Sequence, residues 1–155
     1  VHHLVEIAIG ELPLVLDQNP DVVIGIVGSY PDPELVGELA SMPAVRTFYD
    51  VPDVTPYQFG ARVLVNPVAV GSGVQVKMLD MLMTDAPIVT RTQGLSGLPA
   101  SLRDQFDVAD DEVAFANAIL HRLASPEVDL ASRAVARRQI GVDTVRDALA
   151  QLKLD

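Results

Sequence analysis

The residues best suited to bind a charged ligand fall in one segment, residues 66–80, whose sequence is NPVAVGSGVQVKMLD. Two glycines in this segment, Gly71 and Gly73, let the backbone approach a ligand without collision from a Cβ atom. The apolar helical pattern that follows presents free backbone N–H groups at its start, where the helix dipole is positive. This combination of a flexible loop and a helix start is suited to a phosphate or a diphosphate.

Two charged residues, Lys77 and Asp80, interrupt that apolar helical pattern. At positions i and i+3 they share one face of the helix. A helix that is apolar nearly all round is expected to be buried. Charged side chains are rarely buried without a partner, so the presence of Lys77 and Asp80 on one face of this helix requires an explanation. In a ligand site, Lys77 would neutralise phosphate charge and Asp80 would accept hydrogen bonds from ribose hydroxyls. The alternative is a surface ion pair between them, which would contribute little to stability.

Other motifs for phosphate binding, catalysis or metal binding do not fit the sequence. A Walker loop needs Gly-Lys followed by Ser or Thr, whereas Lys77 follows Val76. A dinucleotide-binding fingerprint needs a third glycine where Val76 stands. His2, His3 and His121 do not have the spacing of metal ligands. We therefore expect neither a metal nor a cofactor.

The composition restricts the class of protein. The chain has 155 residues and 49% hydrophobic content, which fits one α/β domain over residues 1–155. The net charge of −10 argues against a nucleic-acid surface, because backbone phosphates require clustered Lys and Arg. No apolar run approaches the roughly 20 residues of a membrane helix. The lack of cysteine is typical of a cytoplasmic protein, which is the location we expect.

Strand-like and helix-like segments alternate, which is typical of a parallel sheet with helices on both faces. Strands are predicted over residues 22–27, 45–48, 62–65, 87–90 and 106–109. Helices are predicted over residues 1–16, 34–41, 53–60, 74–84, 112–123, 126–139 and 143–154. The first strand is continuously apolar and is expected to be buried on both faces. Asp53 is expected to cap the helix 53–60, and Asp85 to end the helix 74–84 in a left-handed conformation.

The order of these elements differs from that of a complete doubly wound sheet. Such a sheet normally has its first strand near the centre, ahead of its first helix. This chain opens on a helical pattern instead. We therefore expect a Rossmann-like sheet that lacks its first central strand, and we expect that strand in sequence upstream of Val1.

Several short motifs occur in an order that is found in one enzyme family. These motifs are Val65-Asn66-Pro67, Gly71-Ser72-Gly73, Lys77, Leu79-Asp80, Pro87-Ile88-Val89-Thr90 and Gly97-Leu98. Together they resemble the carboxy-terminal, donor-binding half of group 1 (family 4-like) glycosyltransferases, which have the GT-B fold. The resemblance extends from about Leu4 to Arg138.

The resemblance implies an enzyme of glycan biosynthesis built from two Rossmann-like domains that face each other across a cleft. The half represented here would bind a nucleotide-diphosphate sugar, and the upstream half would bind the acceptor. Any catalytic base would come from that upstream half, so residues 1–155 alone are expected to show no transfer. Peripheral membrane contact through the upstream half stays open.

The resemblance also implies roles for individual residues. Those expected to contact the donor diphosphate and sugar are Gly71, Ser72, Gly73, Val74 and Lys77. Asp80 stands where the family's ribose-binding carboxylate is found. The loop that contains Tyr49 and Val51 would border the base.

The sequence departs from the family pattern at three positions. Many relatives have a second carboxylate eight residues before the ribose-binding one, where this chain has Ser72. Asp80 is a methylene shorter than the usual glutamate, and Tyr49 replaces a common glycine. Two alternatives to a transferase therefore stay open, namely a non-catalytic nucleotide-binding module and another GT-B enzyme such as a nucleotide-sugar epimerase.

Overall fold

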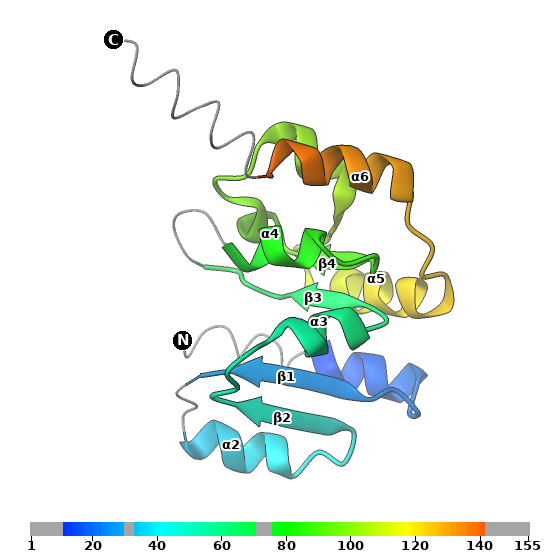
Figure 1. Cartoon of the computed structure of the whole chain (residues 1–155). Helices are drawn as coiled ribbons and strands as arrows, with labels where there is room; N and C mark the ends of the chain where they lie inside the picture. The colour runs from blue at the N-terminus through cyan, green and yellow to red at the C-terminus, as the bar shows by residue number, and fades with distance from the viewer. Residues whose placement is uncertain (1–10, 30–32, 71–75, 142–155) are drawn as a thin grey trace.

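The computed structural model describes residues 11–29, 33–70 and 76–141, and shows helices packed around two small sheets (Figure 1). One sheet contains β1 (Ile24–Gly28) and β2 (Val45–Tyr49). The other contains β3 (Leu64–Asn66), β4 (Ile88–Thr90) and β5 (Asp107–Val108), in the order β3-β4-β5. All strand pairs are parallel. The predicted α/β class with parallel strands is therefore confirmed.

The described helices match five of the predicted ones in position. They are α2 (Pro33–Ala40), α3 (Thr55–Gly60), α4 (Val76–Leu82), α5 (Glu112–Ala124) and α6 (Leu130–Gln139). A further helical stretch covers residues 11–18, while the rest of the predicted helix 1–16 and all of 143–154 lie outside the described residues. Two short 3₁₀ helices that were not predicted, η1 (Thr92–Leu95) and η2 (Ala100–Gln105), lie between β4 and β5.

The strands of the two described sheets follow a doubly wound order in which one position is not filled by any described strand. The usual order is 3-2-1-4-5-6, and β2-β1 followed by β3-β4-β5 reproduces it when strand 1 is left out. The arrows of β1 and β3 point in the same direction (Figure 1). In the described part of the chain, no strand pairs with the second edge of β1 or of β3. This split agrees with the expected lack of a central strand.

Strand β1 is less buried than its apolar sequence predicts. Ile24, Ile26 and Val27 are half-buried, and Val23, directly before the strand, is 66% exposed. The prediction of a strand buried on both faces was therefore wrong. The physical reason is that β1 has a single neighbouring strand among the described residues, so one of its edges and part of its side-chain surface lack cover.

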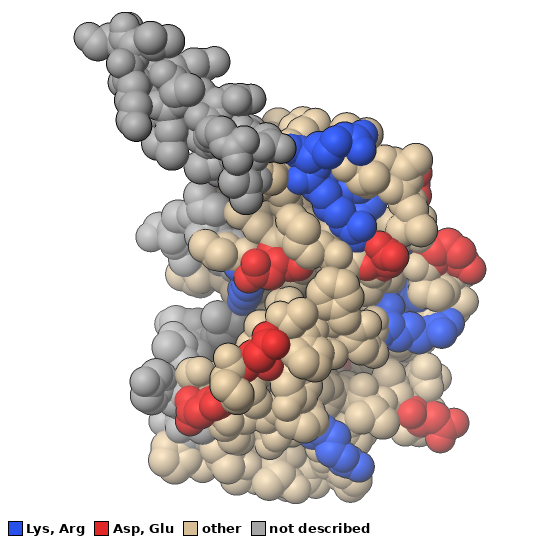
Figure 2. Space-filling view, viewed as in Figure 1, with Lys and Arg blue, Asp and Glu red and all other residues tan. Residues whose placement is uncertain are grey.

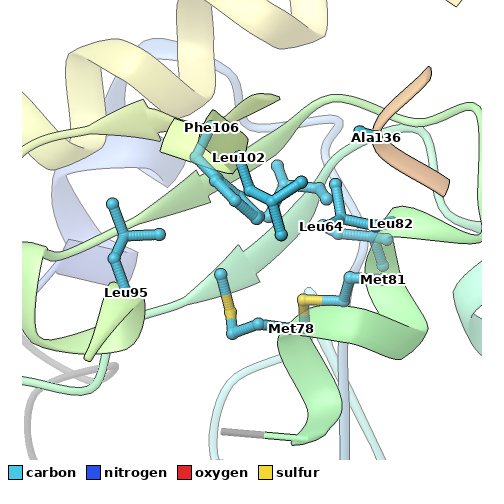
Figure 3. Packing of buried hydrophobic residues seen from close by; sticks show 9 residues of the cluster. Leu64, Met78, Met81, Leu82, Leu95, Leu102, Phe106 and Ala136 are labelled. Carbon is cyan, nitrogen blue, oxygen red and sulfur yellow. The ribbon is translucent and has the colours of Figure 1, made fainter. Parts of the chain in front are cut away.

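The main core packs against the three-stranded sheet (Figure 3). Its buried members come from β3, α4, β4, the two 3₁₀ helices, the segment before β5 and α6: Leu64, Met78, Met81, Leu82, Ile88, Leu95, Leu102, Phe106 and Ala136. A smaller cluster of Leu12, Leu39 and Val45 joins the first helical stretch and α2 to the β1–β2 sheet. Each large side chain buried in this way contributes about 1.5–3 kcal/mol to folding.

Helix α4 is buried on one side only. Met78, Met81 and Leu82 are buried, with the i, i+3, i+4 spacing of a single helix face. Val76 on the same helix is 64% exposed, and the neighbouring Met83 is 40% exposed. The prediction that this helix is buried nearly all round was wrong, because the sheet and α6 cover one face and leave the other open.

The turns around two aspartates only partly follow the predictions. Asp53 accepts a hydrogen bond from the Thr55 backbone N–H at 2.9 Å, and contacts with Thr55 hold the pKa of the Asp53 carboxyl below its usual value. Its side chain thus supports the start of α3, although Val54 occupies the N-cap position. Helix α4 ends earlier than predicted, at Leu82, where the Met83 and Thr84 backbone N–H groups bond to the Asp80 and Met81 carbonyls. Asp85 therefore does not end the helix in a left-handed conformation, and its carboxylate pairs with Arg137 at 2.7 Å. Among described residues other than glycine, only Asp50 has a positive φ, 52°.

Candidate functional site

The carboxyl ends of β3, β4 and β5 meet at one edge of the three-stranded sheet. Asn66 at the end of β3 is paired with Thr90 at the end of β4, and Thr90 with Val108 at the end of β5. Figure 1 shows that α4 begins on the side of the sheet at which β3 ends. In open parallel sheets, ligands bind beyond the carboxyl ends of the strands. The predicted site residues of α4 therefore lie at the ligand-binding end of the sheet.

Close packing fixes the position of this edge. Asn66 and Thr90 are both fully buried. The Thr90 hydroxyl lies within donating distance of the Asn66 carbonyl, at 3.2 Å, and the Asn66 amide donates to the Met78 sulfur at 2.9 Å. A Cβ atom on Gly94 would lie only 2.2 Å from the Thr90 Oγ1. The strand ends are thereby tied to α4 on one side and to η1 on the other.

Lys77 and Asp80 have different environments on α4. Lys77 is half-buried, and Asp80 is exposed. Burial lowers the pKa of the Lys77 ammonium from its ordinary value of 10.5. Within the described residues no ion pair joins the two side chains, so the surface pair considered as an alternative does not form. A cation that is partly removed from water and has no ion pair with a described carboxylate favours the approach of an anionic ligand.

Four of the other predicted site residues belong to the glycine-rich loop before α4. Gly71, Ser72, Gly73 and Val74 lie outside the described residues. Their predicted contacts with a diphosphate and a sugar stay predictions.

The residues predicted to border a base lie at the carboxyl end of the other sheet. Tyr49 is the last residue of β2, and both it and Val51 are half-buried. Between them, Asp50 donates its backbone N–H to the Gly28 carbonyl at 2.9 Å and takes its left-handed conformation. The Tyr49 hydroxyl oxygen is buried and has no hydrogen-bond partner among the described residues. Both sheets thus bring predicted residues to their carboxyl ends.

One charged residue at the carboxyl edge was not predicted. Arg91 directly follows β4 and is 7% exposed. Its guanidinium pairs with the Glu11 carboxylate, donates to the Asp110 carbonyl oxygen, and lies 5.2 Å from the centroid of the Phe115 ring. The position of an arginine directly after a strand was a usable signal, but nothing in the sequence connected it with Glu11. This residue joins the first helical stretch to the three-stranded sheet.

A shallow depression of about 570 Å³ opens beside Arg91. It is lined by Ala69, Arg91, Asp110, Asp111, Glu112 and Val113. The Thr92 backbone N–H and hydroxyl both donate to the Asp110 carboxylate at 2.8 Å, and they hold the pKa of that carboxyl below its usual value. Three acidic residues surround a single arginine that is already paired. The depression is therefore unsuited to a diphosphate, and Lys77 remains the better candidate for phosphate contact.

The histidines do not form a metal site within the described residues. His121 is exposed in the last turn of α5, whereas His2 and His3 lie outside the described residues. The described part of the chain contains no group of three or more His, Cys, Asp or Glu residues that could hold a metal ion. None of its helices is long and apolar enough to cross a membrane. The expectation that no metal or cofactor takes part stays a prediction.

Comparison with known proteins gives two findings. The family model described as "Glycosyl transferases group 1" matches residues 2–125. A relative in Klebsiella pneumoniae, described as an uncharacterized 44.6 kDa protein in the cps region, is 25% identical over 120 residues. That match covers 70% of this chain and 30% of the relative, so the chain spans less than a third of the relative's length. Because the family match covers well over half of the sequence, the chain belongs to the group 1 glycosyltransferases.

Proposed function

We propose that this chain is the donor-binding half of its glycosyltransferase and that it holds a nucleotide-diphosphate sugar. The observation that carries the proposal is the half-buried Lys77, which lies on a helix that begins at the carboxyl edge of the sheet and has no ion pair with any described carboxylate. Family membership supports glycosyl transfer in general. A bound diphosphate would give Lys77 the anionic partner that it does not have among the described residues. Its position would also agree with the rule that ligands bind beyond the carboxyl ends of parallel strands.

In this proposal, residues at the carboxyl ends of the two sheets contact different parts of the donor. Lys77 contacts the phosphates, and the glycine-rich loop at residues 71–74 faces the diphosphate and the sugar. Asp80, which is exposed and one turn further along α4, accepts hydrogen bonds from the ribose. Tyr49 and Val51, at the carboxyl end of β2, border the base.

The chemistry proposed for Lys77 is electrostatic. When the glycosidic bond to the diphosphate breaks, negative charge develops on the departing phosphate oxygens. A cation fixed beside those oxygens stabilises the charge without reorganisation at the moment of reaction. In this proposal the acceptor and any catalytic base belong to a second domain of the full-length enzyme.

One observation favours a second candidate function. Ser72 stands where many relatives have a carboxylate that contacts the donor sugar. A protein without that carboxylate could retain nucleotide binding and have lost turnover. The second candidate is therefore a non-catalytic nucleotide-binding module.

The test of donor binding uses the full-length protein and calorimetric titration with UDP, GDP and ADP. Replacing the ammonium in Lys77→Gln is expected to weaken binding of the preferred diphosphate about tenfold or more, since a hydrogen bond to a charged group contributes about 1.5–3 kcal/mol. The parent nucleoside, which has no phosphate, should be bound equally by the variant and the wild type. The matched control is Arg103→Gln, because Arg103 is an exposed cation on η2 and is not among the residues proposed to contact the donor. Undiminished diphosphate binding by Lys77→Gln would refute the phosphate role.

Turnover separates the two candidate functions. The full-length protein is incubated with nucleotide sugars and an extract of candidate acceptors, and released nucleotide and glycosylated product are measured by mass spectrometry. An enzyme releases nucleotide together with a glycosylated product, and the Lys77→Gln and Asp80→Asn variants lose both. Tight nucleotide binding without release of nucleotide would identify a non-catalytic module.

A further inference from the structure

The carboxyl end of α4 is held by a side chain from α6. The last carbonyl groups of a helix have no partner within the helix and need other donors. Arg137 supplies one of these donors, its Nε, to the Leu82 carbonyl at 2.8 Å, and an Nη2 hydrogen bonds to the Thr84 carbonyl, two residues beyond the helix, at 2.7 Å. The same Nη2 pairs with the Asp85 carboxylate at 2.7 Å. One guanidinium thus binds three groups within residues 82–85, where α4 ends.

A second arginine of α6, Arg133, binds the same region from the interior. It is 1% exposed. Its Nη1 lies 2.9 Å from the Thr84 carbonyl and 3.3 Å from the Ala86 carbonyl, and its Nε donates to the Gln105 Oε1 at 2.9 Å. The Thr84 carbonyl therefore receives hydrogen bonds from both arginines. Arg133 connects the end of α4 to the segment that enters β4 and to η2.

The charges of these arginines suit the place where they bind. Cationic groups near the carboxyl end of a helix interact favourably with its dipole. Figure 2 shows basic side chains gathered over α6 at the top of this face of the molecule. Apolar packing acts in the same direction, since Ala136 lies between the two arginines in sequence and is buried in one cluster with Met81 and Leu82. Helix α6 thus fastens α4 through both polar and apolar contacts.

We propose that Arg133 and Arg137 are positioning residues for the donor site, which they serve by fixing where α4 lies along its own axis. This inference rests on the proposed function, because the groups being positioned are Lys77 and Asp80. A helix behaves as a stiff rod with a rise of about 1.5 Å per residue, so Leu82 is only about 7.5 Å along the axis from Lys77. Any slide of the carboxyl end is transmitted to the ligand-binding end. A misplacement of about 1 Å in a binding group can reduce rates by as much as 100-fold.

A positioning role for Arg133 and Arg137 predicts a change in nucleotide affinity that a purely stabilising role does not predict. If the arginines only stabilised the fold, replacing one would lower the unfolding free energy but leave the affinity of the folded molecules for nucleotide unchanged. If they position α4, the folded variant binds nucleoside diphosphate more weakly. Local opening of α4 should also increase, whereas that of α5, to which neither arginine is hydrogen-bonded within the described residues, should not change.

The experiment uses the full-length protein with Arg137→Gln and Arg137→Lys. Arg137 is chosen because its side chain is 29% exposed, so the variants are expected to fold, and Arg133→Lys provides a second variant. The matched control is Arg138→Gln, an exposed arginine on the same helix. Titration with the preferred nucleotide among UDP, GDP and ADP is combined with hydrogen exchange of α4 and α5 peptides, and circular dichroism measures the folded fraction.

The expected result for Arg137→Gln is a dissociation constant for the nucleotide raised about tenfold, with faster exchange in α4 and unchanged exchange in α5. Arg137→Lys, which retains the charge but loses the planar fork, should give an intermediate value. The Arg138→Gln control should match the wild type. Wild-type affinity and wild-type α4 exchange in a folded Arg137→Gln protein would overturn the inference alone. A wild-type protein that binds none of the three nucleotides would refute the proposed function and this inference with it.

Discussion

Replacing Gly94 by alanine tests the packing at the carboxyl edge of the sheet. A Cβ atom at this position would lie 2.2 Å from the Thr90 Oγ1 and 2.7 Å from the Asn66 amide nitrogen. Neither neighbour is the free end of a long side chain, since both residues are fully buried in the sheet. The Thr90 hydroxyl also lies 3.2 Å from the Asn66 carbonyl and 3.1 Å from the Arg91 carbonyl. The new methyl group can be accommodated only if these groups move.

The expected loss of stability follows from those contacts. Insertion of a methyl group into a well-packed core destabilises by about 1–3 kcal/mol. Displacing the Thr90 hydroxyl adds about 1 kcal/mol for the hydrogen bond that it makes. We therefore expect Gly94→Ala to lower the free energy of unfolding by about 2–4 kcal/mol, a large share of the 5–15 kcal/mol typical of a domain.

The assay is urea denaturation followed by circular dichroism, with the midpoint and slope compared between variant and wild type. The matched control is Gly37→Ala, because Gly37 lies inside α2 and a Cβ there would meet nothing within 4 Å. The control should raise the unfolding free energy by about 0.5–1 kcal/mol, the usual preference for Ala over Gly in a helix. A Gly94→Ala loss below about 1 kcal/mol would show that the edge has room to relax, and would contradict the tight packing described here.

Two further predictions concern ionisation. Burial raises the pKa of the Glu11 carboxyl above 4.5 despite its pairing with Arg91. Around this pH the folded state therefore binds more protons than the unfolded state does. The free energy of unfolding should accordingly fall as the pH rises from about 4.5 through the folded pKa of Glu11. In Glu11→Gln this decline should be absent from the unfolding free energy measured against pH, and an unchanged decline would refute the assignment to Glu11. Burial also lowers the pKa of Lys77, so NMR titration of the ¹³C-labelled Lys77 side chain should give a value below 10.5 that rises when a nucleoside diphosphate binds. A Lys77 pKa that does not change on binding would contradict direct contact with the phosphates.

The helices and strands were predictable because the sequence patterns that indicate them are local. The apolar β-branched runs and helical stripes gave β1 to β5 and α2 to α6, with ends that differ by a few residues from the observed ones. The two 3₁₀ helices between β4 and β5 escaped prediction, since such short helices show little hydrophobic periodicity. The burial of β1 was overestimated because burial depends on neighbouring strands, which the run of apolar residues does not reveal.

The candidate site was predictable to a smaller degree. The position of Lys77 and Asp80 on one helix followed from their spacing, and their location at the carboxyl end of the sheet followed from the strand order. The contacts of Arg91 with Glu11, and of Arg133 with Thr84, join residues 80 and 49 positions apart. Spacing within one element says nothing about such pairs, because the packing of distant elements creates them.

The split sheet has a consequence for how the protein behaves in solution. β1 has the sequence Ile-Gly-Ile-Val-Gly, with no charge and no proline, and only one of its edges is paired in the described part of the chain. Natural sheets protect an open edge with lysines, prolines, bulges or a covering element, because unpaired backbone groups are a template for other strands. An apolar edge that stays unpaired promotes self-association between copies. We therefore expect the solubility of this domain to depend on whether a further strand pairs with that edge of β1.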